Sequence, residues 1–362
     1  MAAVSDREQR ILGIIETARG KRAKFRDEQI TMAHGAGGKA TQTLIEGLLV
    51  PALRNEALAA LGDAGSVTTA GGARLALTTD SYVVRPLRFP GGSIGELAVN
   101  GTANDLAVSG ARPLAMSLSL ILEEGLAADT LRAEVDAIAA AARAAQVQIV
   151  AGDTKVVERG HADGMYICTS GIGELDPRGS LSPAALAPGD RILLSGSIGQ
   201  HGTAIMLARD DFDLEAQIES DTRPLWPAVD ALLDAAGPQL RCMRDATRGG
   251  VASVLNELAR ASSVSIAVRE RDVPVVPAVA GAAELLGIDP MYIANEGKLV
   301  AFVAPDGAQR ALAALRGVPG CEDAAEIGEV RAQPPGMVLV QTAFGGRRVM
   351  DQLVGDPLPR IC

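Results

Sequence analysis

Glycine-rich turns recur along this chain between an apolar strand pattern and a helical pattern. The first follows a strand pattern that begins at Ile30 and reads His34-Gly35-Ala36-Gly37-Gly38-Lys39. Similar turns occur at 90–95, 196–202 and 249–250. Glycine lets backbone N–H groups approach an anion, and a helix N-terminus favours negative charge. The pattern predicts an α/β fold with anion-binding loops, although a single glycine loop is more often an ordinary turn.

The length of the chain favours two domains. Its 362 residues exceed one typical hydrophobic core. A loop-like stretch near Asp176 to Ser180 separates two series of strand and helix patterns. We therefore predict an N-terminal extension, two domains and a tail, at 1–29, 30–176, 177–342 and 343–362. The extension is compatible with an amphipathic docking helix or a disordered leader, and the sequence leaves both open.

Charge and cysteine usage exclude several classes of protein. The net charge of −10 argues against general nucleic-acid binding, because attraction to phosphates requires a basic surface. No apolar run reaches the roughly 18 residues that a membrane span needs. The four cysteines form no CxxC pair, so neither a zinc signature nor a dense disulfide framework is expected. A reducing cytoplasm fits this usage best.

Four acidic residues of the first domain stand where a metal ligand is expected. Asp63 lies in a glycine turn, Asp80 ends a strand pattern, and Asp105 follows Asn104 in a helical run. Asp153 directly follows a buried strand pattern that ends at Gly152. Mg²⁺ takes a few carboxylates together with waters and substrate phosphates. The alternative is structural, since aspartate is common at helix caps and in turns.

Other candidate residues also lie in turns beside predicted strands. Lys155 follows Asp153 and suits a phosphate or a substrate, or is a surface lysine. Arg248 follows Thr247 ahead of a helical pattern and adds positive charge there. Glu296 precedes the strand pattern at 299–303. Functional groups are often held in such turns by a rigid scaffold.

The last residue of the chain is Cys362. The two prolines of the sequence Gly355-Asp356-Pro357-Leu358-Pro359-Arg360-Ile361-Cys362 predict a semi-stiff extended strap rather than a helix. A thiol on such a strap can enter a pocket or swing out to another protein, and its thiolate is the reactive form. A frayed terminus is the alternative. We expect Cys168 to be core packing, and Cys242 and Cys321 have no catalytic neighbours.

The order of these motifs along the chain is more specific to a protein family than any single motif is. The chain resembles the HypE family of hydrogenase maturation factors, which are carbamoyl dehydratases of the aminoimidazole-ribonucleotide-synthetase-like superfamily. The resemblance covers about residues 30–362, and the terminal Pro-Arg-Ile-Cys distinguishes the family within the superfamily. The motifs that carry it are His34-Gly35-x-Gly37-Gly38-Lys39, Thr79-Asp80-Ser81, Asn104-Asp105-Leu106, Gly152-Asp153-Thr154-Lys155, Arg244-Asp245-x-Thr247-Arg248-Gly249-Gly250, Asn295-Glu296-Gly297-Lys298 and Pro359-Arg360-Ile361-Cys362.

The resemblance implies a fold and a reaction. The fold has two α/β (α+β) domains with a flexible C-terminal tail, and the strands of the first domain pair with a second subunit in a homodimer. A HypF-like carbamoyltransferase loads a carbamoyl group on Cys362. ATP then phosphorylates the carboxamide oxygen, and loss of phosphate leaves a thiocyanate. The cyanide passes to iron on a HypC–HypD-like assembly complex.

The resemblance also implies roles for particular residues. Lys155 and Glu296 would lie near the thiol of Cys362, and either could be the general base. Mg²⁺ would be held by Asp63, Asp80, Asp105 and Asp153. ATP would be bound by Gly37, Gly38, Lys39, Asp80, Asn104, Asp105, Asp153 and Thr247.

Proteins that share the fold remain as alternatives. Selenophosphate synthetases carry a reactive cysteine near the first glycine loop, where this chain has His34-Gly35-Ala36. Thiamine-monophosphate kinases and purine-pathway synthetases have no need of a terminal cysteine. A non-catalytic carrier that uses nucleotide as a switch is an alternative of another class. ATP turnover that depends on carbamoylated Cys362 would separate enzyme from carrier.

Overall fold

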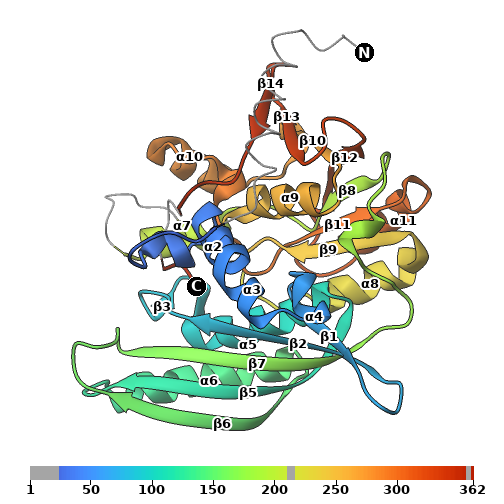
Figure 1. The fold of residues 1–362 in the computed structure, drawn as a ribbon. Helices are drawn as coiled ribbons and strands as arrows, with labels where there is room; N and C mark the ends of the chain where they lie inside the picture. The colour runs from blue at the N-terminus through green and yellow to red at the C-terminus, as the bar shows by residue number, and fades with distance from the viewer. Residues whose placement is uncertain (1–23, 210–216, 356–359) are drawn as a thin grey trace.

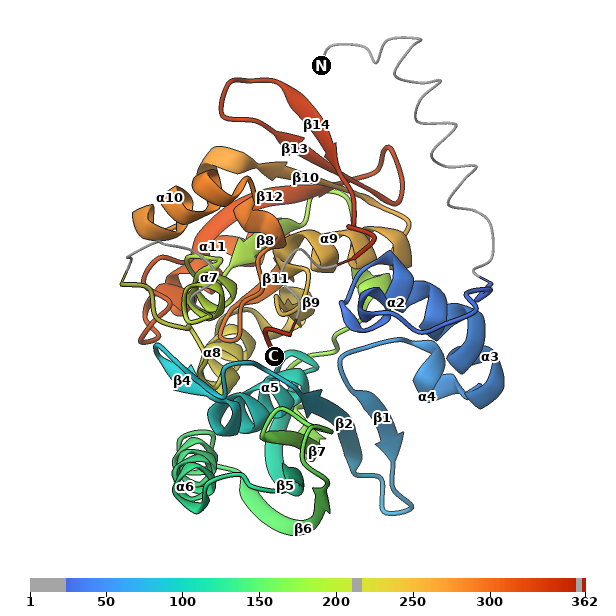
Figure 2. The ribbon, with the colours of Figure 1, turned by 90° about the vertical axis from the view of Figure 1, so that its left-hand side faces the viewer.

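The computed structural model describes residues 24–209, 217–355 and 360–362, so most of the predicted N-terminal extension lies outside the described residues. Two β-sheets dominate the two halves of the molecule (Figure 1). Two views at right angles both place the C-terminus between these halves (Figures 1 and 2). No helix within the described ranges has both the length and the apolar character needed to cross a membrane.

The first half is built on a five-stranded sheet of order β1-β2-β7-β5-β6, in which only the β5–β6 pair is parallel. Its strands are β1 (Gly65–Thr68), β2 (Arg74–Tyr82), β5 (Ala111–Glu123), β6 (Gln148–Val157) and β7 (Met165–Leu175), with a small hairpin of β3 (Arg88–Phe89) and β4 (Gly92–Ser93). Its helices are η1 (Met32–Gly35), α2 (Lys39–Leu44), η2 (Ile45–Leu49), α3 (Val50–Leu53), α4 (Glu56–Ala59), α5 (Ile94–Val108) and α6 (Ala128–Ala144).

The second half is built on a seven-stranded sheet of order β14-β13-β10-β12-β8-β11-β9. Its strands are β8 (Arg191–Leu194), β9 (Leu240–Asp245), β10 (Ser265–Arg269), β11 (Leu299–Val303), β12 (Ala325–Arg331), β13 (Met337–Gln341) and β14 (Arg347–Met350). Its helices are α7 (Gln200–Leu207), α8 (Trp226–Ala236), α9 (Gly250–Ala261), α10 (Pro277–Leu286) and α11 (Pro305–Arg316), with short η3 (Pro183–Ala185), η4 (Gly237–Gln239), η5 (Glu270–Asp272) and η6 (Pro290–Tyr292).

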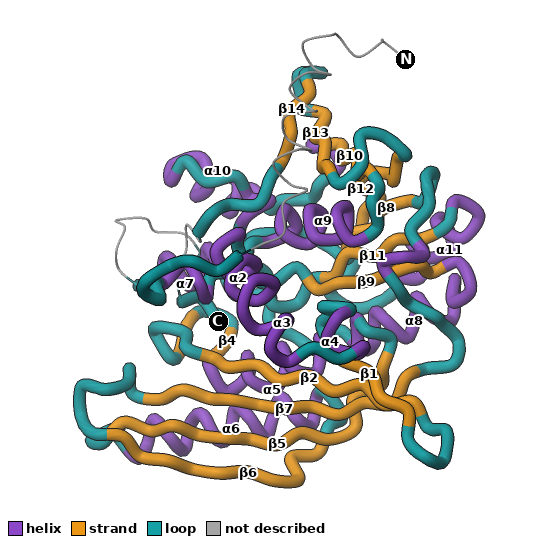
Figure 3. The backbone as a smooth tube through the Cα atoms, in the orientation of Figure 1, coloured by secondary structure: helices purple, strands orange, loops and turns teal. Residues whose placement is uncertain are grey.

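Helices cover both faces of the second sheet, which gives that half two hydrophobic layers (Figure 3). The layer under α9 includes Val251 and Leu255 and packs on Phe302. The layer under α8 and α11 includes Leu232 and Leu315. The all-apolar strand β11 contributes to both, as expected for a central strand with two buried faces.

Helix α5 is the central element between the halves. Nearly every residue in it is buried, and it contacts β2, β5, β7 and α6 of the first half as well as α8 and β9 of the second. Small residues make this close packing possible. A Cβ placed on Gly101 would lie 2.2 Å from the hydroxyl of Tyr82. Most residues of α5 are small or apolar on every side, which suits a helix that is buried all round.

Within the part of the chain that the structure describes, helices cover only one face of the first sheet. Helices α5 and α6 pack on the same face of it (Figure 2). Along β7 the residues alternate between the two faces, with Ile167 and Thr169 buried under α5 and Tyr166, Cys168 and Ser170 half-buried or exposed. Cys168 was expected in the core, and its place on the open face corrects that expectation.

Four strand predictions differ from the structure. The strand pattern that was predicted to begin at Ile30 forms no strand, and the short helix η1 begins at Met32 instead. The strand that was expected to be buried and to end at Gly152 continues as β6 to Val157, and it is exposed because it forms the edge of the sheet. Asp80 lies within β2 rather than at its end. The predicted tail contains β14, which pairs with β13 at the edge of the second sheet. Apolar runs do not reveal which strand of a sheet lies at an edge.

We expect two glycine-to-alanine substitutions to have opposite effects on stability. Gly101→Ala forces Tyr82 to move within packed α5 and should lower the free energy of unfolding by about 1–3 kcal/mol. Gly281→Ala in α10 meets nothing within 4 Å and should raise it by about 0.5–1 kcal/mol, because alanine favours a helix. Denaturant unfolding measures both, and a stable Gly101→Ala protein would contradict the close packing of α5.

Candidate functional site

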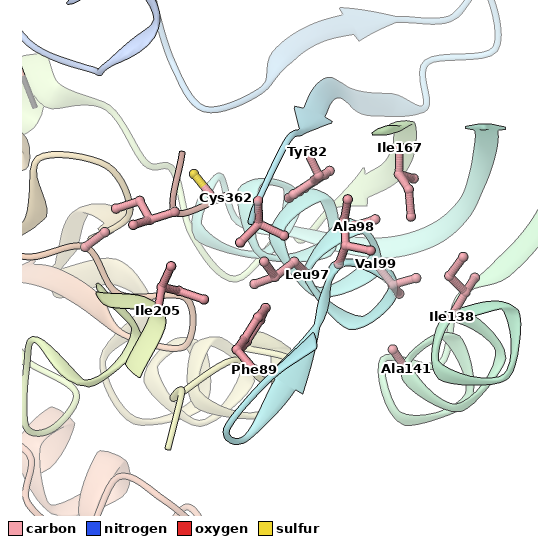
Figure 4. Close-up of a cluster of buried hydrophobic side chains, with 14 of the residues drawn as sticks. Tyr82, Phe89, Leu97, Ala98, Val99, Ile138, Ala141, Ile167, Ile205 and Cys362 are labelled. Atoms are coloured by element: carbon pink, nitrogen blue, oxygen red, sulfur yellow. The ribbon is translucent and has the colours of Figure 1, made fainter. Parts of the chain in front are cut away.

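The end of the chain is docked between the two halves. Ile361 is 1% exposed and Cys362 is 9% exposed. The N–H of Val83 donates to an oxygen of the α-carboxylate of Cys362 at 3.2 Å, and that of Arg85 donates to the carbonyl oxygen of Arg360 at 3.4 Å. The last residues thus run antiparallel to the segment that follows β2. Figure 4 shows Cys362 within the cluster of buried side chains that also contains Tyr82 and Leu97.

Side chains from both halves hold this docked end. The guanidinium of Arg209 donates to the carbonyl oxygen of Arg360, and the imidazole of His201 bonds to that of Ile361 at 2.6 Å. The side chain of Arg360 pairs with Asp163, and this contact lowers the pKa of that carboxyl below its ordinary value. In this structure the terminal thiol is therefore inside the molecule.

Buried carboxyl groups gather close to the docked end, where α5 meets β2 and β9. Asp105 accepts a hydrogen bond of 2.8 Å from the hydroxyl of Thr78. Burial raises the pKa of Asp105 and of Asp245 well above the ordinary value, and the negative charges of Asp80 and Asp63 raise both further. Asp105 and Asp245 therefore keep their protons to a higher pH than an exposed aspartate does.

Asp63 differs from the other acids because it has a cationic partner. Arg244 of β9 forms an ion pair with it across the two halves of the molecule. Burial raises the pKa of Asp63, while the guanidinium of Arg244 opposes that shift. The pair therefore joins the turn before β1 to the second sheet.

Glu296 is another buried acid of this site. It is 3% exposed, and burial together with Asp245 and Asp221 raises its pKa well above the ordinary value. Arg248 acts in the opposite direction and favours the carboxylate. The pKa of Arg248 is itself raised, chiefly by the negative charge of Cys362. Arg248 is thus the cation shared by the terminal cysteine and Glu296.

The loop that carries Glu296 is fixed from several sides. Its own N–H donates to Asp221 at 3.1 Å, and Asp221 forms a buried ion pair with Lys298 at 3.3 Å. The amide of Asn104 donates to the carbonyl oxygens of Glu296 and Arg223 and accepts from the N–H of Leu225. Asn104 was predicted to bind nucleotide, and in this conformation its amide serves this loop.

The first glycine loop lies beside Arg248. A Cβ on Gly37, whose φ is +74°, would lie 3.0 Å from that of Arg248. The first amides of α2 are not open to a phosphate here, since Lys39 N–H and Ala40 N–H donate to the carbonyl oxygens of Leu353 and Val354.

The neighbours of this loop are also engaged by the chain. A Cβ on Gly38 would lie 2.5 Å from the carbonyl oxygen of Leu353, and Lys39 Nζ pairs with Asp351 at 2.8 Å. Thr247 is half-buried ahead of α9, and its carbonyl oxygen accepts from Gly250 at 2.9 Å. The open phosphate cradle expected from the sequence is therefore occupied in this conformation by residues 351–354.

Asp153 and Lys155 are not brought to this site within one chain. Register places Asp80 opposite Thr169 and Asp153 opposite Ser119, which itself lies opposite Cys168. Thr169 is buried and donates to Ala98 of α5, so Asp80 lies on the α5 face and Asp153 on the open face. Residues two apart share a face.

Their local contacts agree with this placement. Lys155 Nζ pairs with Asp153 at 2.6 Å, and both side chains are largely exposed. The lysine is the main cause of the lowered pKa of Asp153. None of the acids on the α5 face is among the causes of that pKa shift.

The structure adds residues that the site predictions did not include. Asp245 and His201 were visible in glycine-rich motifs at the start of helical patterns, as was the candidate cation Arg248, and this position was a usable signal. Tyr82 follows the predicted strand, and its hydroxyl lies 3.4 Å from Asp80 and 3.3 Å from Thr102. Asp221 lies in a stretch without a recognisable pattern, so no local signal pointed to it.

The carboxylates suit a metal ion only together with a ligand. Within 24–209, 217–355 and 360–362, no three carboxylate, imidazole or thiol groups are arranged to hold a metal by themselves. The donor set nevertheless fits Mg²⁺, which binds through one or two carboxylates plus substrate phosphates. Burial is the main cause of the raised pKa values of Asp105 and Asp245, and neighbouring acids add to it, so a bound cation would favour their charged forms.

Known proteins resemble this chain over nearly its whole length. Residues 61–175 and 187–340 match the N-terminal and C-terminal domains of AIR synthase related proteins. The carbamoyl dehydratase HypE of Bradyrhizobium diazoefficiens is 47% identical over 342 residues, which are 94% of this chain and 99% of that protein. The crystal structure of a HypE–HypF complex matches with a TM-score of 0.81 and 42% identity over 86% of this chain and 99% of that one. The crystal structure of HypE in complex with ATP matches with a TM-score of 0.77 and 43% identity, and the match covers 92% of this chain and 100% of that one.

The chain belongs to the HypE family. Nearly full coverage at this identity separates it from the other enzymes of the superfamily fold, and the two-domain α/β prediction is confirmed. In this chain the buried Cys362, the buried Glu296 and Arg248 interact electrostatically in one site.

We expect Asp245→Asn to stabilise the nucleotide-free protein while weakening Mg–ATP binding. The folded-state pKa of Asp245 is raised, so its stability contribution is present at low pH and is lost as pH rises through that pKa. The substitution should raise the melting temperature by a few degrees at about pH 8 and by less at about pH 5.

Calorimetric titration with Mg–ATP measures the second effect. Asp136→Asn on exposed α6 is the matched control and should change neither quantity. A lower melting temperature for Asp245→Asn at the higher pH would contradict the like-charge account of this site.

Proposed function

We propose that this chain is an ATP-dependent carbamoyl dehydratase that converts an S-carbamoyl group on its own Cys362 into a thiocyanate. The observation that carries the proposal is the burial of the terminal cysteine between the two halves, where it interacts electrostatically with Arg248, as Glu296 also does. Relatives that are named carbamoyl dehydratases and a HypE structure with bound ATP support the same reaction.

The reaction divides into two steps. The carboxamide oxygen of the S-carbamoyl group attacks the γ-phosphorus of ATP, which releases ADP and leaves an O-phosphorylated imidate with loss of one N–H proton. The second N–H proton then leaves as the C–O bond breaks, which gives inorganic phosphate and the S–C≡N group. Phosphorylation is needed because an amide oxygen is a poor leaving group. Phosphoryl transfer of this kind depends mainly on positioning and charge.

The buried residues suit the proton transfers. A general base must be deprotonated when it acts, and Arg248 is the group that favours the carboxylate of Glu296. The raised pKa of Glu296 also makes its carboxylate a stronger base than an exposed glutamate. Mg²⁺ would be held by Asp63, Asp80 and Asp105 and would offset the charge of the nucleotide phosphates. Asp245 joins this set as a further acid of the site.

The open sheet face supports a homodimer in which Asp153 and Lys155 serve the partner's site. Both side chains lie on the face opposite the acids of their own chain, on an exposed edge strand. The same face carries exposed or half-buried apolar residues such as Leu77 and Ile172, and exposed β6 carries Val150. A second copy that packs on this face would bury them and bring Lys155 toward the other chain's Cys362. A C2 arrangement would do this twice.

Two partners follow from the proposed reaction. A HypF-like carbamoyltransferase would supply the carbamoyl group, in line with a solved HypE–HypF complex. A HypC–HypD-like complex would receive the cyanide on iron for nickel–iron hydrogenase assembly. The tail must leave its docked place for both events. We place the reaction in the cytoplasm, because none of the four cysteines forms a disulfide.

We expect Cys362→Ala to abolish modification. The wild-type protein incubated with ATP and the carbamoyl donor system should carry the cyano group on the C-terminal peptide alone, as measured by mass spectrometry. Cys168→Ser should react normally, since serine is close to cysteine in size and can keep the contact of that side chain with the hydroxyl of Thr79. Modification of any thiol other than Cys362, or ATP turnover by Cys362→Ala, would favour a nucleotide-switched carrier instead.

We expect the Lys155→Ala and Glu296→Ala proteins to be inactive alone and to complement each other when mixed. If each site combines Glu296 of one chain with Lys155 of the other, a mixed dimer contains one intact site. After subunit exchange, activity should recover to about one quarter of wild type. The thiocyanate formed per chain is measured. No recovery despite verified exchange would mean that both residues act within one chain.

A further inference from the structure

His201 occupies a buried position between the docked tail and the segment at 220–222. It is fully buried, with its ring edge against Phe89 at a centroid distance of 5.6 Å. One ring nitrogen, Nε2, lies 2.6 Å from the carbonyl oxygen of Ile361, and the other, Nδ1, lies 2.8 Å from the hydroxyl of Ser220. None of the roles proposed above uses this residue.

The partners of His201 fix its tautomer. The carbonyl oxygen of Ile361 can only accept, so Nε2 must carry the hydrogen. Burial lowers the pKa of His201, which favours the neutral ring, and Nδ1 then accepts from the hydroxyl of Ser220. The oxygen of Ser220 in turn accepts from the N–H of Thr222 at 3.2 Å. The hydrogen bonds thus run in one direction from Thr222 to the tail.

The elements that hold His201 also hold the loop of Glu296. The N–H of Gly199 donates to the side chain of Asn295 at 2.8 Å, and that of Gly202 donates to the carbonyl oxygen of Ala294 at 3.1 Å. Both glycines flank His201 at the start of α7. On the other side, Asp221 follows Ser220 and accepts from the N–H of Glu296. The tail and this loop therefore share one frame.

We propose that His201 is a positioning residue that sets the register of Cys362 against Glu296, with Ser220 holding its imidazole in the required tautomer. The backbone contacts of Val83 and Arg85 fix the tail along one edge only. The hydrogen bond from His201 fixes the carbonyl next to Cys362 from the opposite side. Losing it leaves the thiol able to shift or undock, although the catalytic groups themselves are unchanged.

Two amide variants separate this role from simple packing. In H201Q the amide nitrogen of the introduced glutamine side chain falls near the place of Nε2 and can still donate to Ile361. In H201N the shorter amide falls near the place of Nδ1, so it can contact Ser220 but cannot reach the tail. Both variants remove the aromatic ring, and both therefore lose the contact with Phe89 to a similar degree.

The test is the rate at which iodoacetamide alkylates each of the four thiols, read by peptide mass spectrometry on the full-length protein. We expect Cys362 in H201N to react about tenfold faster than in wild type, which matches the loss of one buried hydrogen bond, and Cys362 in H201Q to stay near wild type. Cys168 on the open face is the internal reference, and Cys242 and Cys321, which are 3% and 1% exposed, report any general loosening.

Two outcomes would overturn the proposal. One is an equal response of Cys362 in both variants, whether raised or unchanged, which would mean that donation to Ile361 is not what matters. The other is a parallel rise of Cys242 and Cys321 in H201N, which would mean a structural role. This assay needs neither ATP nor the carbamoyl donor, so it can be read even if the proposed function is wrong.

The proposed function adds a second readout. H201N should lower the rate of thiocyanate formation, with the affinity for Mg–ATP unchanged in calorimetry, and H201Q should restore most of that rate. Unchanged thiocyanate formation in H201N, in a protein whose Cys362 has become more reactive, would contradict the link between tail register and catalysis.

Discussion

The buried helix α5 is the constraint on which the rest of this structure depends. It contacts strands of the first half and helix α8 and strand β9 of the second, so the two halves can meet only around it. A polar group in such a helix must find partners within the protein, because no water reaches it. Asn104 finds them in three backbone groups of the second half, and one of these belongs to Glu296. The same packing that closes the molecule therefore places the glutamate.

The acids of the site lower the stability of the folded protein, and they lower it more at high pH, where they lose their protons. Asp245 and Glu296 are buried and Asp105 is half-buried, and the negative charge of Asp245 adds to burial in raising the pKa of both Asp105 and Glu296. Clusters of this kind are found where a protein binds cations and phosphates or moves protons, rather than where it gains stability. Two arginines act on these acids in different ways. Arg244 forms an ion pair with Asp63 and joins the halves, whereas Arg248 interacts electrostatically with Cys362 and Glu296.

The fold class, the family and most of the candidate motifs could be predicted from the sequence, because each motif is a short stretch that can be interpreted without knowledge of distant contacts. Sequence reasoning could not reach what depends on the pairing of distant strands. Asp153 was expected among the metal ligands and Lys155 beside the thiol, but only the register of β6 against β5 shows which face they occupy. It also could not foresee that residues 351–354 would cover the first amides of α2, since both segments look like open chain in the sequence. Asp221 was missed for the same reason, because its partners are far away in sequence.

The docked tail and the open sheet face point to two different states of the same protein. Docking joins the terminal carbonyl groups to Val83, Arg85 and His201 and removes the thiol from any partner protein. Arg360 holds a left-handed backbone, with φ of +59°, which is uncommon for a residue that is not glycine and is sustained here by its contacts with Asp163 and Val83. Those contacts are individually modest and partly exposed, so release requires breaking a few hydrogen bonds rather than unfolding a core. A carrier of a reactive group needs this balance, because the thiol must be enclosed during chemistry and exposed during transfer.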